Sequence, residues 1–98
     1  MQIVTNLRDD AAIAECLISI AQLAATQGAF EKFARLLGMA EGAFPDITKR
    51  LFPLFRTETE KIIELARANL GEESYTTEWE VGRQMKLEAA VAYALKEL

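Results

Sequence analysis

The amino-acid sequence predicts an all-α fold, and three observations lead to that prediction. Alanine, leucine and glutamate are the most frequent of the 98 residues, and all three favour helix. The two prolines, Pro45 and Pro53, lie near the middle of the chain and leave long uninterrupted stretches on either side. β-branched residues never alternate with polar ones over the length of a strand. The length suits one small domain, so residues 1–98 are expected to form a single helical unit.

A helical hairpin is predicted for residues 9–45. Asp9 or Asp10 serves as the N-cap of its first helix, whose apolar surface is broad enough to pack on two sides. Gly28 ends this helix, and the second helix spans about residues 30–44, with a proline directly after it. Because the link between the two helices is very short, they are expected to be antiparallel neighbours.

The next segment, residues 47–56, differs in composition from the rest of the chain. It holds three basic residues and no acid, and large apolar side chains are interleaved with them. One interpretation is a loop or a short turn of helix whose aromatic residues close the end of the core, as a small domain requires. The other is a basic-aromatic contact patch for a partner, since aromatic residues and arginine are enriched at interface anchors. The residues of this patch are Lys49, Arg50, Phe52, Phe55 and Arg56.

Three further helices are predicted within residues 57–98. The first spans about residues 58–70, with Thr57 as its N-cap and Glu60 completing a capping box. The second spans about residues 73–83 and ends in a Gly-Arg pair that allows close helix packing. The closing helix has the clearest amphipathic spacing in the chain, given by Leu87, Ala90, Val91, Ala94, Leu95 and Leu98.

Two aromatic residues of the second of these helices, Tyr75 and Trp79, lie one turn apart. We interpret them as core anchors, because aromatic side chains contribute much of the buried area of small cores. The alternative is that the two rings form a platform for a ligand.

The amino-acid composition excludes most kinds of catalytic site. Histidine is absent and Cys16 is the only cysteine, which excludes a Ser-His-Asp triad, a disulfide within the chain and a cysteine-based zinc site. The five glycines are isolated from one another, so no phosphate-binding loop is present. We interpret Cys16 as a small buried hydrophobe, and the acidic residues as a solvated face rather than a Mg²⁺ or Ca²⁺ site. The sequence therefore predicts no enzyme and no catalytic, cofactor-binding or metal-binding residues.

Charge and hydropathy restrict the partner and the compartment. Fifteen acids against 11 bases give a net charge of −4, which disfavours nucleic acid and anionic membranes as partners. Charged residues precede any long apolar run at the N-terminus, which is the wrong order for a secretory signal. The most apolar stretch, residues 11–25, is too short and too polar for a membrane span. With a single cysteine, these features predict a cytoplasmic protein.

Residues 9–45 resemble a tetratricopeptide repeat. Gly28 matches the glycine at the turn of that repeat, and Pro45 matches its terminal proline. The other matching positions are Leu17, Ile20, Ala21, Leu37 and Ala40. The sequence departs from the repeat at Ala24, where tyrosine is usual, and at Phe33, where a small alanine is usual. The bulk of Phe33 would separate the two helices unless the opposite helix leaves space for it.

A longer resemblance covers nearly the whole chain. The stretches AECLISIAQLAATQGAFEKFARLLGMAEGAF and LGEESYTTEWEVGRQMKLEAAVAYAL are similar to the C-terminal region of large bacterial signal-transduction ATPases and LuxR-type transcriptional regulators. The matching elements are residues 35–41, 70–73 and 87–95, with Tyr75, Trp79, Gly82 and Arg83. The resemblance implies a tetratricopeptide-like hairpin followed by three further helices, as the end of a right-handed superhelix or as a small bundle. It also implies that residues 57–98 act as capping helices.

The function expected from this reasoning is a non-enzymatic protein-interaction or capping module of a bacterial signalling or transcription regulator. The repeat resemblance implies that a protein, a peptide or a neighbouring repeat lies against one face of the first helix. The residues of that face are Glu15, Ile18, Ser19, Gln22, Ala25 and Thr26. An exposed apolar flank would also allow a second copy of the chain to bind. The alternative is a small helical DNA-binding domain, although no predicted helix carries the basic recognition surface that DNA requires.

Overall fold

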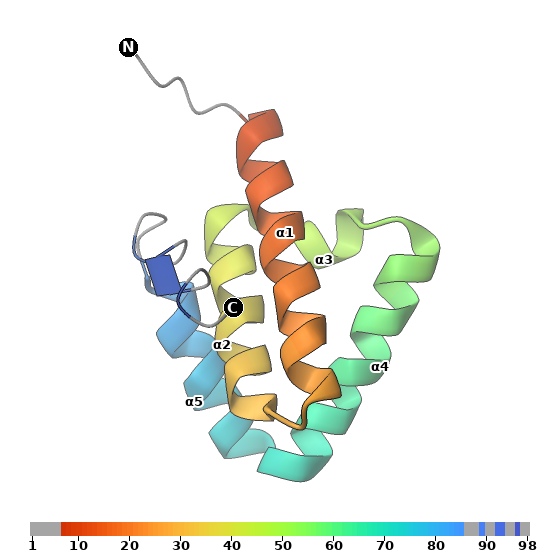
Figure 1. Ribbon diagram of the computed structural model, residues 1–98, viewed down its shortest axis with the longest axis vertical. Coiled ribbons are helices and arrows are strands. Elements are labelled where there is room, and N and C mark those ends of the chain that lie inside the picture. Colours follow the sequence, from red (N-terminus) through yellow and green to blue (C-terminus); the bar gives the residue numbers. More distant parts are fainter. Residues whose placement is uncertain (1–6, 86–88, 90–91, 94–95, 97–98) are drawn as a thin grey trace.

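The computed structural model describes residues 7–85 together with residues 89, 92, 93 and 96, and the surroundings of side chains from residue 11 onward (Figure 1). Within residues 7–85 the helices are α1 (Leu7–Thr26), α2 (Phe30–Ala43), α3 (Ile47–Arg50), α4 (Pro53–Leu70) and α5 (Glu72–Arg83). No strand occurs in the described part of the chain, which confirms the predicted all-α fold. The six apolar residues that define the predicted closing helix lie outside the described residues.

The helical hairpin is formed by α1 and α2, which run antiparallel in Figure 1. Gly28 takes a left-handed conformation (φ 77°) that favours glycine. Its amide donates to the Ala25 carbonyl oxygen at 2.9 Å, and the Ala29 amide donates to the Ala24 carbonyl oxygen at 3.0 Å. These two bonds form a Schellman motif, which satisfies the last carbonyl groups of α1 and turns the chain at once. The predicted stop at Gly28 is therefore confirmed.

α1 differs from its prediction in two respects. It begins at Leu7, so Asp9 and Asp10 belong to its first turn and neither is the N-cap. Acidic residues in that turn suit the positive end of the helix dipole, which explains how these residues fit there. Cys16 is exposed, and its prediction as a buried residue is wrong. Among the described residues, α1 packs mainly on α2 and touches α3 and α4 less, so its broad apolar surface is not buried all round by them.

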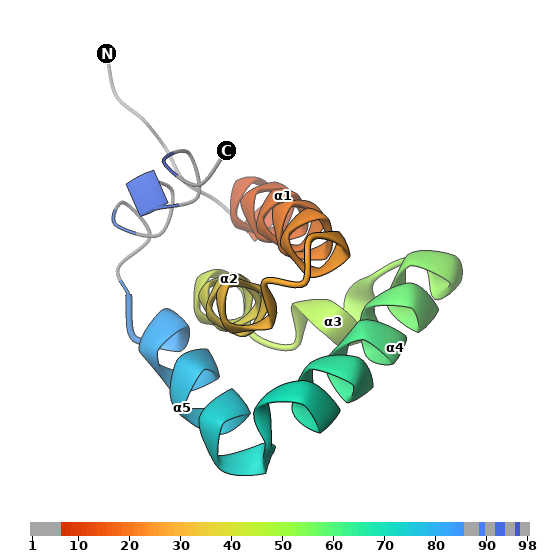
Figure 2. The ribbon, with the colours of Figure 1, turned by 60° about the horizontal axis from the view of Figure 1, so that its bottom comes forward.

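α2 is the central helix of the fold. Figure 2 shows it between α1 on one side and α5 on the other, and both neighbours pack along it extensively. Half of its 14 residues are buried, and the large ones among them are Phe33, Leu36, Leu37 and Met39. Burial of each such side chain contributes about 1.5–3 kcal/mol to folding. Phe33 is fully buried although it departs from the repeat pattern, and small Ala14 and Ala21 are among the buried residues of α1.

Glycines on α2 and α5 allow these two helices to approach very closely. A Cβ atom at Gly38 would overlap the carbonyl oxygen of Trp79, and one at Gly82 would overlap the carbonyl oxygen of Arg35. At Gly42 the nearest atom, in the last residue of α5, would lie only 2.6 Å away. Since these neighbours are backbone atoms, no rotamer change can make room for a side chain. The close packing predicted at Gly82 is therefore confirmed, and two glycines of α2 share that role.

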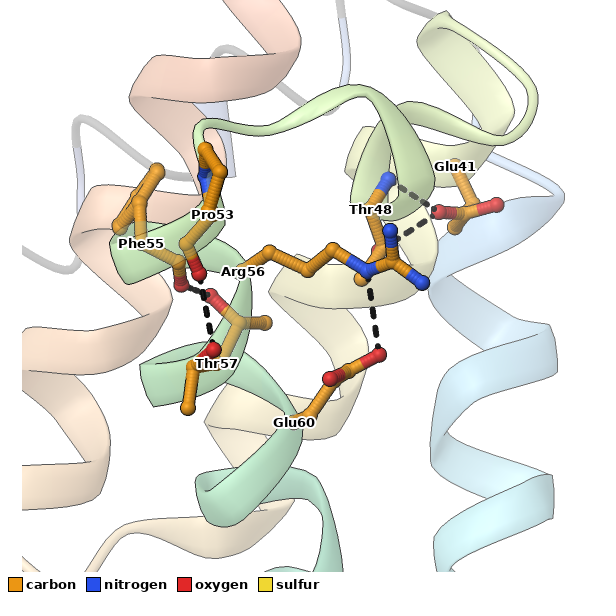
Figure 3. Close-up of polar contacts among 8 residues, drawn as sticks. Glu41, Thr48, Pro53, Phe55, Arg56, Thr57 and Glu60 are labelled. Atoms are coloured by element: carbon orange, nitrogen blue, oxygen red, sulfur yellow. Dashed lines mark hydrogen bonds and ion pairs between the residues drawn. The ribbon is translucent and has the colours of Figure 1, made fainter.

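α4 begins earlier than predicted. Its first residue is Pro53, whose fixed φ and missing N–H group suit the first position of a helix. Thr57 lies one turn inside α4, where its hydroxyl donates to the Pro53 carbonyl oxygen at 2.8 Å (Figure 3). The prediction of Thr57 as an N-cap, with a capping box to Glu60, is therefore wrong.

α4 and α5 are joined by one residue, Gly71, and diverge from it as the two arms of a V in Figure 2. Gly71 has φ 86° and ψ 152°, a conformation that is essentially restricted to glycine. α5 packs closely on α2, whereas α4 touches α1, α2 and α5 much less extensively. Residues of α2, α3, α4 and α5 line a cleft between the two arms.

Candidate functional site

The segment at residues 47–56 divides into a buried set and an exposed set. Ile47 and Leu51 are buried and Phe55 is half-buried, so these residues close one end of the core. Phe52 and Leu54 are 80% and 77% exposed. The two interpretations of this segment therefore apply to different residues. The second exposed apolar residue, beside Phe52, is therefore Leu54 and not Phe55.

The conformation of the turn from α2 into α3 depends on Glu41, near the end of α2. Its carboxylate accepts hydrogen bonds from the Thr48 amide at 3.2 Å and the Thr48 hydroxyl at 2.9 Å (Figure 3). It also accepts one from the Asp46 amide at 3.2 Å. It thereby satisfies N–H groups at the start of α3, which has no side-chain cap from its own N-cap residue. Asp46 has a left-handed φ of 64°, which turns the chain from α2 into α3. This arrangement could not be read from the sequence, because Glu41 looks like any other acid on a helix.

The cations at the corner are accessible. Lys49, Arg50 and Arg56 are all exposed. The Arg50 guanidinium lies 5.1 Å from the centre of the Phe44 ring. Arg56 extends from α4 toward α3, and its Nε lies 3.3 Å from a carboxylate oxygen of Glu60 (Figure 3). Such an exposed pair contributes less than about 1 kcal/mol, so Arg56 can exchange its partner at little cost. We call Lys49, Arg50, Phe52, Leu54 and Arg56 the corner surface.

The predicted face of α1 is only partly accessible. Its exposed members are Glu15, Ser19 and Thr26. Ile18 is fully buried, so its assignment to an outward face is wrong. Gln22 and Ala25 are half-buried, and the Gln22 amide donates to the hydroxyl of Thr59 on α4 at 2.9 Å. The prediction treated this side of α1 as open, whereas α4 packs against it.

A polar cluster joins α2 to α5 and to residue 93. The Arg35 Nε lies 2.7 Å from a carboxylate oxygen of Glu78, and its Nη1 donates to the Tyr93 hydroxyl at 3.0 Å. The guanidinium also lies 5.7 Å from the centre of the Tyr93 ring. Because Arg35 uses its donors on two partners that are themselves half-buried, we interpret this cluster as structural.

The space between α4 and α5 forms a cleft of about 450 Å³. Leu37, Ile63, Tyr75 and Trp79 provide its apolar surface, and charged residues of α2, α3 and α4 surround it. Tyr75 is only 5% exposed, and this burial raises the pKa of its phenol to about 12. Trp79 is half-buried. Both rings pack against the core as predicted, and both also line the cleft, so the two interpretations of this pair are compatible.

The described residues hold neither a cluster of metal ligands nor a membrane-spanning helix. No group of three or more metal-ligating side chains comes together there. None of the helices described has the length and apolar character that crossing a membrane requires. Comparison with protein-family models, with curated proteins and with solved structures gives no match to this chain.

Proposed function

We propose that this chain is a non-enzymatic protein-interaction module that binds an acidic partner protein through the corner surface. The observation that carries this proposal is the exposure of Phe52 and Leu54, at 80% and 77%. Single exposed apolar residues are ordinary on a protein surface. Two large ones within three residues, next to exposed arginines, have the composition of an interface anchor.

Charge favours an acidic partner. The whole chain has a net charge of −4, yet residues 47–56 contain three bases and no acid. An acidic surface would gain three contacts with cations there, and electrostatic attraction would speed its association. Two corner surfaces facing each other would repel, so a second copy of the chain is a poorer occupant.

Photo-crosslinking tests this proposal. A photoreactive phenylalanine analogue is placed at position 52, and in a control variant at position 65, where Leu65 is 53% exposed on α4. In cells that produce the protein, we expect position 52 to give an adduct with one distinct protein and position 65 to give none. Arg50→Glu should remove the adduct. Equal labelling from both positions, no adduct, or an adduct only with a second copy would contradict the proposal.

The resemblance of the sequence to bacterial regulators indicates the kind of protein in which this module would work. On that basis we propose that it belongs to a bacterial signalling or transcription regulator, where its helices would cap a superhelix. A nucleotide-binding domain encoded upstream in the same reading frame would support that setting, and its absence would count against it. The alternative function is DNA binding. A titration with random DNA duplex at low salt tests it, because even non-specific DNA-binding proteins bind under that condition. We expect no binding.

A further inference from the structure

We infer that the cleft between α4 and α5 is a binding site for an aromatic carboxylate, either as a free acid or as the C-terminus of a peptide. This inference goes beyond the corner surface: the cleft shares Lys49 and Arg56 with it, but its apolar lining comes from other residues. The volume of about 450 Å³ lies in the range of small-molecule sites. Such sites combine a mainly apolar lining with a few polar groups that orient the ligand.

The apolar part of the cleft fits a flat ring. Leu37 and Ile63 contribute aliphatic surface, and Tyr75 and Trp79 contribute aromatic rings. Trp79 is half-buried, and the Arg83 guanidinium lies 5.8 Å from the centre of its ring. The Arg67 guanidinium lies 5.3 Å from the centre of the Tyr75 ring. A ligand ring would therefore contact the parts of both rings that these cations leave open. Aromatic pairs gain about 0.5–1.5 kcal/mol beyond the burial of area, which corresponds to a several-fold increase in affinity.

The polar groups that remain open in the cleft are mainly donors. Tyr75 is buried, and its hydroxyl has no hydrogen-bond partner among the described residues. An acceptor on a ligand in the cleft would satisfy this hydroxyl. Lys49 likewise has no described partner, and Arg56 is held only by its exposed pair with Glu60.

The acidic groups in the cleft are mostly engaged. Both carboxylate oxygens of Glu41 accept hydrogen bonds from the start of α3, and Glu60 is paired with Arg56. Asp46 is the remaining acid, and it is exposed. A ligand that enters the cleft therefore meets an ammonium, a guanidinium and a phenol as available groups. A carboxylate accepts from all three, whereas a cation would find few acceptors.

Trp79 provides the readout, because it is the only tryptophan of the chain and lines the cleft. Its fluorescence is titrated with 3-phenylpropanoate and with the uncharged 3-phenylpropanamide, and in parallel with a tripeptide ending in phenylalanine, as free acid and as amide. We expect both acids, or one of them, to bind with a Kd of about 1 mM or below, and each amide about tenfold more weakly. Binding of the peptide acid alone would identify a peptide terminus as the source, and binding of 3-phenylpropanoate alone would identify a free acid.

Matched variants decide whether the cleft is responsible. Lys49→Gln and Arg56→Gln should each weaken the acid about tenfold, and Tyr75→Phe about threefold. Lys61→Gln, on an exposed part of α4 outside the cleft, should have no effect. Equal affinity for acid and amide, no binding at about 10 mM, or equal effects of Lys61→Gln and Lys49→Gln would overturn the inference.

Discussion

Replacing Gly38 with alanine tests the close packing of α2 on α5. Ordinary contacts of a Cβ atom begin near 3.4 Å, whereas a Cβ here would lie 2.9 Å from two backbone atoms of α5 and nearer still to the Trp79 carbonyl oxygen. The two atoms at 2.9 Å alone would require a shift of 0.5 Å, the difference from 3.4 Å, and the nearer carbonyl oxygen requires α5 to move well beyond that. Overpacking of this kind costs about 1–3 kcal/mol, or more where nothing can relax. The better helix propensity of alanine offsets about 1 kcal/mol of this cost.

We therefore expect Gly38→Ala to lower the free energy of unfolding by about 2 kcal/mol, with a fall in Tm of roughly 10 °C. Urea unfolding followed by circular dichroism measures the change. Ala68→Gly, on an exposed position of α4, serves as the control for propensity alone and should cost about 1 kcal/mol. If Gly38→Ala instead stabilises the protein by about 1 kcal/mol, the helices do not meet at this residue and the reasoning is refuted.

Three further predictions follow from burial and hydrogen bonding. Cys16 is exposed, so a thiol reagent should label it in the folded protein nearly as fast as in urea; strong protection would show that something covers α1. Because burial raises the pKa of Tyr75 to about 12, the stability that it contributes should be complete below pH 10 and disappear as the pH rises from 10 through 12. Tyr75→Phe should lack that loss in alkaline unfolding experiments, and an identical pH profile would contradict the assignment. Thr59→Val should cost about 1–2 kcal/mol, because the buried Thr59 hydroxyl accepts from Gln22; an additive double mutant with Gln22→Ala would show that this bond contributes nothing.

The sequence was most informative where structure depends on local signals. Gly28 follows an apolar helix and precedes another, and the left-handed turn that it allows leaves few alternatives to an antiparallel hairpin. The start of α4 was missed although its signal is also local. Pro53 is a good first residue of a helix, but Thr57 and Glu60 imitate a capping box one turn later. Two valid local rules competed here, and the proline prevailed.

The surfaces were less predictable because they depend on how helices lie against one another. Ile18 was assigned to an open face, yet it is fully buried, because α1 packs against three other helices. The cleft brings together residues of four helices, among them Glu41, Lys49 and Tyr75, and no spacing along the chain connects them. Residues 47–56 were predictable in part. Their unusual composition is visible in the sequence, whereas the division between buried Leu51 and exposed Phe52 is not.

The central claim is that Phe52 and Leu54 of the corner surface are exposed in the folded chain and contact a partner rather than the core. The most direct test is the free energy of unfolding of a double variant, Phe52→Ser with Leu54→Ser, compared with the unchanged protein. We predict a difference within about 0.5 kcal/mol, as for substitutions on a free surface. A loss above about 2 kcal/mol, typical of side chains removed from a core, would contradict the claim.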